Sequence, residues 1–285
     1  MKFIHLTDPH IVPEGQTLYG LDPATRLAAA IADINAHHSD AALAVLTGDL
    51  TDKGDAASYA RFRHILSDLA IPSLLLAGNH DDREMLCTAF PEVPATPTRY
   101  VQYVRTTGIG RFVAIDTVDA GASAGHLCAD RLDWLRAALD DANDEPVFLF
   151  MHHPPLAIGI PDLDDCGLRN GQDLGAVLRG RKNIRHLFFG HVHRPVHGVW
   201  QGIPFSALPS TNHQSALALD RLGGILDSHE PPAYSVVLAE ANGDVVVHGC
   251  GFLDESPRFF IGGPDAVAES VPFADLLTLN PTHPK

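Results

Sequence analysis

Basic side chains are scarce in this 285-residue sequence. Lys and Arg number 20 against 35 Asp and Glu, which gives a formal net charge of −15 at pH 7. No cluster of Lys or Arg offsets this balance, so the sequence speaks against a surface that binds a nucleic-acid polymer. An anionic small molecule is not excluded, because bound divalent cations reverse the charge of a local site.

Cysteine is also rare. The four cysteines are scattered, without a C-x-x-C pair: Cys87, Cys128, Cys166 and Cys250. They are expected to be mostly reduced thiols in a cytoplasmic protein. Residues 2–7 are too short and too polar in their flanks for a signal peptide. No apolar run approaches the roughly 18 residues of a membrane-spanning helix, so we predict no membrane contact.

The chain is long enough to bury a large core, and 45% of its residues are hydrophobic. In its first part, expected strands at 2–7, 42–46 and 73–77 alternate with helices at 23–37 and 55–69. The continuous apolar run at 42–46 is typical of a strand buried on both faces. This alternation predicts an α/β sheet covered by helices.

The remainder of the chain is expected to add more strands than helices. Helices are predicted at 129–141 and 171–179, and strands at 100–105, 112–115, 147–151, 186–189, 196–200, 203–207, 234–239 and 245–249. The pair Asn242-Gly243 predicts a two-residue turn between the last two strands. Segments 156–170 and 209–233 lack periodicity, and such long segments tend to be lids or binding loops.

Polar motifs close five of the strand-like runs. They supply seven potential metal ligands: Asp8, His10, Asp49, Asn79, His152, His191 and His193. A single Asp after a strand is usually a cap or turn residue, and a single buried His is usually a core residue. Five motifs at the same topological position, where ligands of α/β sheets collect, are poorly explained in that way. A mixed Asp, Asn and His set suits two neighbouring divalent cations, which are a device for hydrolysing phosphate esters.

The order and spacing of these motifs carry a resemblance. The motifs are D-x-H at 8–10, G-D-x-x-x-x-G at 48–54, G-N-H-D at 78–81, a His after an apolar strand at 152, and G-H-x-H at 190–193. They resemble the calcineurin-like metallophosphoesterase superfamily. Leu18-Tyr19-Gly20 and the run from Met151 to Leu156 more narrowly resemble class III cyclic nucleotide phosphodiesterases and bacterial glycerophosphodiester phosphodiesterases. The resemblance implies a four-layer αββα sandwich with two mixed sheets.

The resemblance also implies how the ligands divide between two cations. One cation would be held by Asp8, His10 and His193, and the other by Asn79, His152 and His191. Asp49 would bridge both through its two carboxylate oxygens. Nitrogen and oxygen ligands without thiolate suit Mn, Fe, Co or Zn, and a metal-bound hydroxide would be the nucleophile.

His80 follows a ligand and, by the family pattern, points at the substrate. We expect it to be catalytic, either stabilising charge on the phosphoryl group or protonating the leaving alkoxide. Asp81 either orients the His80 ring or caps a helix. His153 either supports a ligand by a hydrogen bond or is held by packing, and His5 is expected to be structural.

His213 and Tyr19 are expected to bind substrate. In the resembling enzymes a loop at the position of His213 lines the substrate pocket. A purine would favour an aromatic partner, for which Tyr19, Phe205 and Trp200 are candidates, although each is also a plausible core residue. The sequence therefore leaves the identity of the alcohol portion open.

We predict a metal-dependent hydrolase of small phosphodiesters, such as glycerophosphodiesters or a broad range of diesters, with 3′,5′-cyclic nucleotides as the alternative. A phosphomonoesterase or protein phosphatase is less favoured, because a protein phosphatase needs an open, shallow face and the irregular segments suggest a covered pocket. A non-catalytic scaffold is disfavoured because no ligand position is lost. A carboxylate pair for glycoside hydrolysis would leave the histidines unexplained, and amidohydrolases use other spacings. The catalytic domain is expected at 1–208 and 234–250, with 209–233 as a cap or dimerisation segment of a possible homo-oligomer and 251–285 as a C-terminal extension.

Overall fold

The computed structural model describes residues 1–257, which contain six helices and thirteen strands joined by loops. The helices are α1 (Pro23–His37), α2 (Ala56–Leu66), α3 (Arg83–Ala89), α4 (Ala129–Asp141), α5 (Pro161–Asp164) and α6 (Gly171–Leu178). The strands are β1 (Lys2–Leu6), β2 (Ala44–Leu46), β3 (Ser73–Leu75), β4 (Tyr103–Thr107), β5 (Gly110–Ile115), β6 (Val147–Met151), β7 (Ile184–Phe189), β8 (Val196–Trp200), β9 (Ile203–Ala207), β10 (Gln214–Ser215), β11 (Asp227–Ser228), β12 (Tyr234–Ala239) and β13 (Val245–Cys250).

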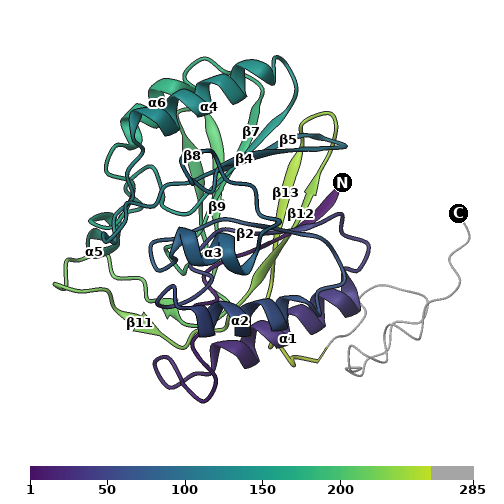
Figure 1. The fold of residues 1–285 in the computed structure, drawn as a ribbon, viewed down its shortest axis with the longest axis vertical. Coiled ribbons are helices and arrows are strands. Elements are labelled where there is room, and N and C mark those ends of the chain that lie inside the picture. The colour runs from purple at the N-terminus through teal and green to yellow at the C-terminus, as the bar shows by residue number, and fades with distance from the viewer. Residues whose placement is uncertain (258–285) are drawn as a thin grey trace, which may run out of the picture. The chain divides into compact units, whose positions relative to one another are not determined.

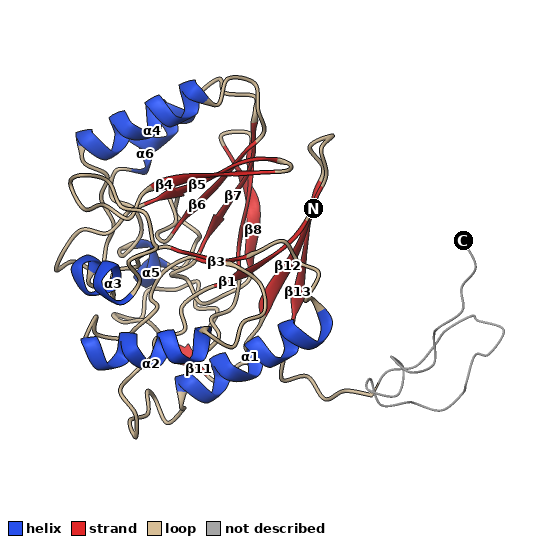
Figure 2. Cartoon of the chain, turned by 45° about the vertical axis from the view of Figure 1, so that its right-hand side comes forward, coloured by secondary structure: helices blue, strands red, loops and turns tan. Residues whose placement is uncertain are grey.

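Two mixed sheets lie face to face between layers of helices (Figure 1). One sheet has the order β13-β12-β1-β2-β3, and the other has the order β4-β5-β6-β7-β9-β8. Figure 2 shows α1 and α2 beyond the first sheet and α4 and α6 beyond the second. The predicted αββα sandwich is therefore confirmed. The tail from residue 258 onward, which the predicted extension includes, lies outside the described residues.

The helices begin where the sequence supplies caps. Asp22 precedes α1, and its side chain accepts a hydrogen bond from the backbone N–H of Ala24, while Pro23 occupies the first helical position. Asp55 caps α2 in the same way through the N–H of Ser58. Both arrangements satisfy backbone donors that the helix itself leaves unpaired. The apolar face of each helix then packs on the first sheet.

Alternate residues of the central strands face opposite layers. Phe112, Phe150 and Phe188 point toward the first sheet, where the ring centroid of Phe3 lies 4.9 Å from that of Phe112 and 5.6 Å from that of Phe188. The residues between them pack beneath α4 and α6: Val113, Leu149, Leu187 and Phe189. Successive side chains of a strand point to opposite faces, so one apolar run fills two cores. The aromatic layer holds the two sheets in a fixed relation.

Parallel pairing brings the ends of five strands to one edge of the sandwich. Strands β1, β2 and β3 are parallel neighbours, and so are β5, β6 and β7. The loops that follow β1, β2, β3, β6 and β7 each carry one of the predicted motifs. The fold therefore delivers all five motifs to the same edge.

Some predicted boundaries are wrong for identifiable reasons. The strand expected at 100–105 lies at Tyr103–Thr107, because the N–H of Val101 donates to Asp116 Oδ2 at 2.9 Å instead of to a neighbouring strand. Residues 240–244 connect β12 to β13, and the N–H of Glu240 donates to the carbonyl of Asp244 at 2.9 Å, so the turn is longer than the two residues predicted. The sequence analysis missed α3, α5 and the β10–β11 pair, all of which are short.

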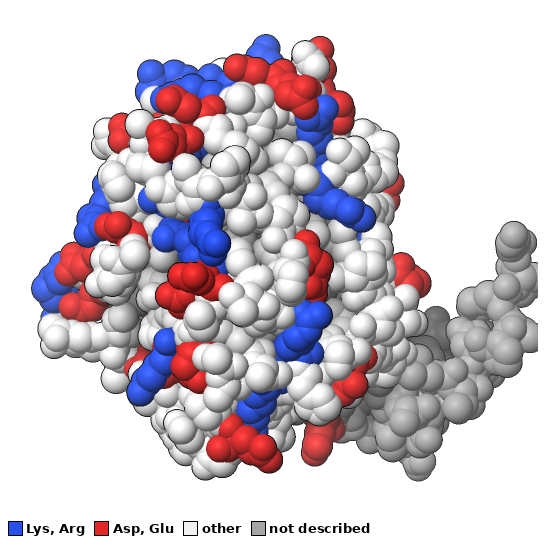
Figure 3. All heavy atoms as spheres, in the orientation of Figure 1, with Lys and Arg blue, Asp and Glu red and all other residues white. Residues whose placement is uncertain are grey.

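Charged side chains of both signs are intermixed on the face shown in Figure 3. Arg111 pairs with Glu145 at 3.0 Å, and Arg194 pairs with Glu230 at 3.3 Å, so several of the few basic groups have an acidic neighbour. Within residues 1–257, no helix has the length and apolar character needed to cross a bilayer.

A buried carboxylate joins the loops that follow β2 and β3. Asp81 accepts hydrogen bonds from the backbone N–H groups of Leu50 (3.0 Å), Thr51 (3.1 Å) and Gly78 (2.9 Å), and from the hydroxyl of Tyr59 (2.8 Å). It neither orients the His80 ring nor caps a helix, contrary to both readings of the sequence. The cap of α3 is its neighbour, Asp82. Asp81 thus fixes two loops of the motif-bearing edge.

We predict that Asp81→Ala destabilises the protein by about 3 kcal/mol or more, because it leaves several buried N–H donors unpaired. The matched control is Asp82→Ala, which removes only the α3 cap at the Met85 N–H and is expected to cost about 1 kcal/mol. Urea unfolding at one fixed metal concentration measures both changes. Equal, small losses for the two variants would contradict the role assigned to Asp81.

Candidate metal centre

Most of the predicted ligands lie in an uncommon backbone conformation. Five of the seven have φ between 45° and 69°: Asp8, His10, Asp49, His191 and His193. Residues other than glycine seldom adopt this left-handed region, and each instance costs about 1–3 kcal/mol. Such residues persist only where surrounding contacts hold them, and they cluster at functional sites.

Two motif glycines allow the loops to approach one another. A Cβ atom on Gly78 would lie 2.2 Å from Asp49 Oδ1, and one on Gly190 would lie 2.0 Å from Thr7 Oγ1 and 2.8 Å from Asp8 Oδ2. Any larger residue would displace a predicted ligand or the residue that supports it. The glycines of the two motifs are therefore explained by close packing of backbone against side chain.

The first group of donors comes from the loops after β1, β2 and β7. His193 Nε2 lies 3.3 Å from Asp8 Oδ1 and 3.1 Å from His10 Nε2, and His10 Nε2 lies 3.6 Å from Asp49 Oδ2. All four side chains are buried. Ligands at 2.0–2.2 Å from a common cation are separated by about 3 to 3.5 Å, so this spacing suits a bound metal ion.

The second group comes from the loops after β2, β3, β6 and β7. His152 Nε2 lies 3.1 Å from Asn79 Oδ1, 3.3 Å from Asp49 Oδ2 and 3.2 Å from His191 Nδ1. These separations again match neighbouring ligands of one cation. All seven predicted ligands thus fall into two adjacent groups.

Asp49 belongs to both groups, but in a different way from the one expected. Its Oδ1 accepts the backbone N–H of His80 at 2.8 Å, while its Oδ2 faces His10 in one group and His152 in the other. One oxygen, instead of two, is therefore directed between the groups. The N–H of His80 fixes the carboxylate in that orientation.

Hydrogen bonds from His152 and His193 to backbone carbonyls determine which ring nitrogen of each can bind a metal ion. His152 Nδ1 donates to the carbonyl of Thr47 at 2.8 Å, and His193 Nδ1 donates to the carbonyl of His213 at 3.0 Å. Each bond places the ring proton on Nδ1 and leaves the Nε2 lone pair facing the donor group. This is the usual arrangement behind a metal-binding histidine.

Asp8 is supported by a chain of hydroxyl groups. Its Oδ2 accepts the Thr7 hydroxyl at 2.6 Å and the N–H of His191 at 3.0 Å, which leaves Oδ1 to face the histidines. The hydroxyl of Thr47 donates to Thr7 Oγ1 at 2.9 Å, and His5 Nε2 donates to Thr47 Oγ1 at 2.9 Å. His5 is thus the buried end of a hydrogen-bond chain, in line with its expected structural role.

Several buried polar atoms have no hydrogen-bond partner among residues 1–257. They include Asp8 Oδ1 and His191 Nε2. An unpaired buried polar atom normally carries a substantial free-energy cost. Because Asp8 Oδ1 lies within the first group, a cation is the partner that its position fits best.

The electrostatics of the groups also favour a cation. Burial alone raises the pKa of Asp8, but His193 and His152 outweigh it and hold that pKa below its ordinary value. Burial, followed by the neighbouring His152, lowers the pKa of His191 to about 3. Burial also lowers the pKa of His152, but Asp49 outweighs burial and raises it to about 9. A metal ion beside Asp49 competes with that proton, as metal ions do at such sites.

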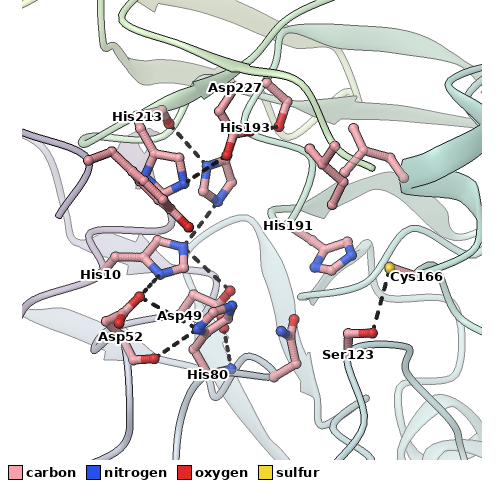
Figure 4. Close-up of a pocket in the computed structure, with 15 residues that line it drawn as sticks. His10, Asp49, Asp52, His80, Ser123, Cys166, His191, His193, His213 and Asp227 are labelled. Atoms are coloured by element: carbon pink, nitrogen blue, oxygen red, sulfur yellow. Dashed lines mark hydrogen bonds and ion pairs between the residues drawn. The ribbon is translucent and has the colours of Figure 1, made fainter. Parts of the chain in front are cut away.

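A pocket of about 140 Å³ opens onto both groups (Figure 4). His80 lines it, with Nδ1 donating to the carbonyl of Asp52 at 2.8 Å, so that Nε2 is the free nitrogen of the ring. His80 is more exposed than any predicted ligand, with a side-chain exposure of 41%. It is therefore the histidine of this cluster that an incoming molecule reaches most easily.

His213 and Tyr19 both line the pocket, as expected of substrate-binding residues. Their rings meet edge to face with centroids 4.7 Å apart. By contrast, Phe205 is buried in the core beneath α4 and α6, and Trp200 packs against that core. His153 is held by Thr117 at 2.7 Å and by the carbonyl of Ser123 at 3.1 Å, so both of its ring nitrogens are engaged.

Sequence reasoning missed other residues of the pocket wall. Asp52 lies 3.6 Å from His10 Nδ1 and carries the carbonyl that holds His80; its place in the G-D-x-x-x-x-G motif was a signal for it. Ser123, Cys166 and Asp227 also line the pocket, and no motif marks them. Figure 4 shows Ser123 and Cys166 on the side opposite His213 and Asp227.

Comparison with known proteins agrees with this geometry. Residues 1–195 match the calcineurin-like phosphoesterase family. A "probable cyclic nucleotide phosphodiesterase" of Rhodopseudomonas palustris is 42% identical over 91% of this chain and 95% of its own length. A "glycerophosphodiester phosphodiesterase GpdQ" of Enterobacter lignolyticus is 31% identical over 75% of this chain and 78% of its own. A "3′,5′-cyclic adenosine monophosphate phosphodiesterase CpdA" of Pseudomonas aeruginosa is 33% identical over 77% and 81%.

The fold recurs in solved structures of lower sequence identity. A dimetal phosphatase from Danio rerio superposes with a TM-score of 0.67 at 15% identity and covers 89% of this chain and 96% of its own. The sequence relationship and the fold agree with the resemblance carried by the motifs. This chain belongs to the calcineurin-like phosphoesterase family.

Proposed function

We propose that the protein hydrolyses small phosphodiesters at a dinuclear metal centre built on Asp49. The observation that carries this proposal is the pair of adjacent donor groups that share Asp49 Oδ2 at the base of a pocket. The predicted enzyme class, a phosphodiesterase, is confirmed by the family and by the names of the relatives.

In this proposal each cation has four ligands from the chain. One cation would be held by Asp8, His10, His193 and Asp49, and the other by Asn79, His152, His191 and Asp49. The short separations between their donor atoms and the unpaired Asp8 Oδ1 support the assignment. Sets of nitrogen and oxygen ligands suit Mn, Fe, Co or Zn, and the prediction covers these four metals together.

Two divalent cations, when bound there, polarise the phosphoryl oxygens and lower the pKa of a water molecule. The protein contributes orientation and a proton. The Asp52 carbonyl accepts the Nδ1–H of His80, so Nε2 is the ring nitrogen that faces the substrate. In the imidazolium form, which carries a proton on both nitrogens, Nε2 donates to a phosphoryl oxygen or gives its proton to the leaving alkoxide. The exposed edge of His80 in the pocket supports this role.

The dimensions of the pocket support a small substrate. At about 140 Å³, and with walls contributed by α5, Tyr19 and the β10–β11 segment, it suits a compact diester better than a folded protein. Glycerophosphodiesters remain our preferred class. Cyclic nucleotides are the second candidate, favoured by the 42% identity to a relative named as a cyclic nucleotide phosphodiesterase.

Exposed apolar side chains near the pocket and the state of the cysteines bear on the oligomeric state and the cellular location of the protein. The segment that includes β10 and β11 exposes several apolar side chains: Leu217, Leu219, Leu222, Ile225 and Leu226. They support the predicted role of 209–233 as a cap or dimerisation segment of a homo-oligomer. Cys87, Cys128 and Cys166 form no disulfide within the described residues, which is compatible with the predicted cytoplasmic location.

Matched substrates test the reaction class. With Mn²⁺ supplied, we expect a higher kcat/KM for glycerophosphocholine than for glycerol 3-phosphate, or for 3′,5′-cyclic AMP than for AMP. The proposed site binds a diester with its alcohol in the pocket, whereas a monoester leaves that wall unused. Faster hydrolysis of the monoester in both pairs would overturn the assignment.

The hydroxyl chain behind Asp8 provides a test of the ligand assignment. Thr7→Val keeps the shape of the side chain but removes the 2.6 Å hydrogen bond to Asp8 Oδ2. Loss of such a support typically weakens metal affinity by about 10–100-fold. Competition with a fluorescent chelator measures the dissociation constant, and Thr25→Val, whose hydroxyl bonds to Asp22 at the α1 cap, is the control. Equal affinities in the two variants would count against Asp8 as a ligand.

His80 and Asp49 are expected to fail in different ways. His80→Ala should keep both metal ions and lower kcat by about 10²–10⁴-fold on a diester with a poor leaving group. Asp49→Ala should lose metal as well as activity, because its carboxylate faces both groups. Elemental analysis of the two purified variants separates these outcomes. A His80→Ala enzyme with full turnover, or an Asp49→Ala protein with two ions per chain, would contradict the roles proposed.

A further inference from the structure

Besides Asp49, two carboxylates that are not predicted metal ligands line the pocket: Asp52 and Asp227. Asp227, on β11, lies in the wall formed by the β10–β11 segment, on the same side as His213 (Figure 4). Its side chain is 31% exposed. The Asp52 carboxylate, in contrast, is engaged by His10 and His80. Asp227 is therefore the carboxylate of this pocket that remains available to a ligand.

The local contacts of Asp227 hold one carboxylate oxygen and leave the other open to the pocket. Oδ1 accepts the hydroxyl of Ser215 at 3.2 Å, and Oδ2 lies 3.9 Å from His213 Nε2, beyond ordinary hydrogen-bond length. Within residues 1–257, no Lys or Arg nitrogen lies within 4.0 Å of the Asp227 carboxylate. Oδ2 of Asp227 thus has no hydrogen-bond partner closer than this histidine among the described residues.

Aromatic and apolar side chains flank this carboxylate. Tyr19 is 61% exposed and packs against His213, and Ile225 and Leu163 also line the pocket. A carboxylate beside an aromatic ring and aliphatic groups matches a positively charged amine or quaternary ammonium, which binds both to anions and to ring faces. A neutral alcohol would leave the Asp227 charge without a partner, and an anionic one would be repelled.

We propose that the preferred substrate carries a cationic alcohol group, with the phosphate at the metal centre and the amine or quaternary ammonium against Asp227 and Tyr19. This inference rests on the proposed phosphodiesterase function and narrows its substrate class. It separates the two candidate classes, because the nucleoside portion of a cyclic purine nucleotide carries no positive charge at neutral pH. The bound molecule is a zwitterion whose two charges face opposite charges of the site.

Two diesters that differ in the charged group test the proposal. Glycerophosphocholine and glycerophosphoglycerol share the glycerol and the phosphate, and only the first carries a cation. We expect kcat/KM of the wild-type enzyme to favour the choline ester by about tenfold, the share of one hydrogen bond or ion pair to a charged group. Asp227→Asn should reduce this ratio to near one, mainly through a higher KM for the choline ester.

Three features of the design keep the result interpretable. Asparagine preserves the shape of Asp227 and still accepts the Ser215 hydroxyl. Asp220→Asn removes an exposed carboxylate of the same segment that does not line the pocket, and it should keep the wild-type ratio. Tyr19→Leu, at an exposed position, should lower the ratio by about threefold through loss of a cation–π contact.

The outcomes separate this inference from the function on which it rests. A wild-type ratio near one, or an Asp227→Asn ratio unchanged from wild type, overturns the cationic subsite while leaving the phosphodiesterase assignment intact. Failure to hydrolyse both of these diesters and 3′,5′-cyclic AMP as well, at two bound metal ions per chain, overturns the assignment itself. A ratio that falls equally in Asp220→Asn and Asp227→Asn is a general charge effect and also overturns the subsite.

Discussion

The Asp49 carboxylate is the constraint on which the site depends. It is buried, it lies within 3.6 Å of histidine nitrogens from two separate groups, and it is held by the N–H of His80. A buried anion of this kind requires compensating charge. The histidines supply part of it as long as they are protonated, and two cations would supply it more completely. Stability of this edge and metal binding are therefore expected to be coupled.

The rest of the fold serves to bring the two groups within reach of one another. Parallel pairing aligns the strand ends, and the Phe3, Phe112 and Phe188 rings hold the two sheets together. The ligand loops themselves are unfavourable, since five ligands have left-handed backbone. The Asp81 network and the close approach at Gly190 offset this cost through contacts between loops. A rigid scaffold thus maintains a strained and highly charged edge.

Much of this arrangement could be predicted because its signals are local. The helix at 129–141 and the strand at 147–151 have the predicted bounds. The seven predicted ligands come from short motifs that follow strands, and the structure brings them together in two adjacent groups. The roles of Asp81 and Asp227 could not be predicted in that way. Asp81 accepts a hydrogen bond from Tyr59, which lies 22 residues earlier in the chain. Asp227 lies beside His213 in the pocket. Contacts between distant segments decide what such a carboxylate does, and no spacing in the sequence records them.

The chain divides its tasks between two regions of sequence. The match to the family ends at residue 195, directly after the last predicted ligand, His193, whereas Asp227 and Ile225 lie beyond it. In the proposed site, cations and histidines would recognise the phosphate, which every candidate substrate shares. The alcohol would meet the wall from the β10–β11 segment, where Asp227 supplies a carboxylate that is not among the proposed metal ligands. The names of the relatives differ in the alcohol portion of the substrate, cyclic nucleotide or glycerophosphodiester. In the site proposed for this chain, that portion would meet a wall that the metal ligands do not form, so one scaffold can accommodate different alcohols there.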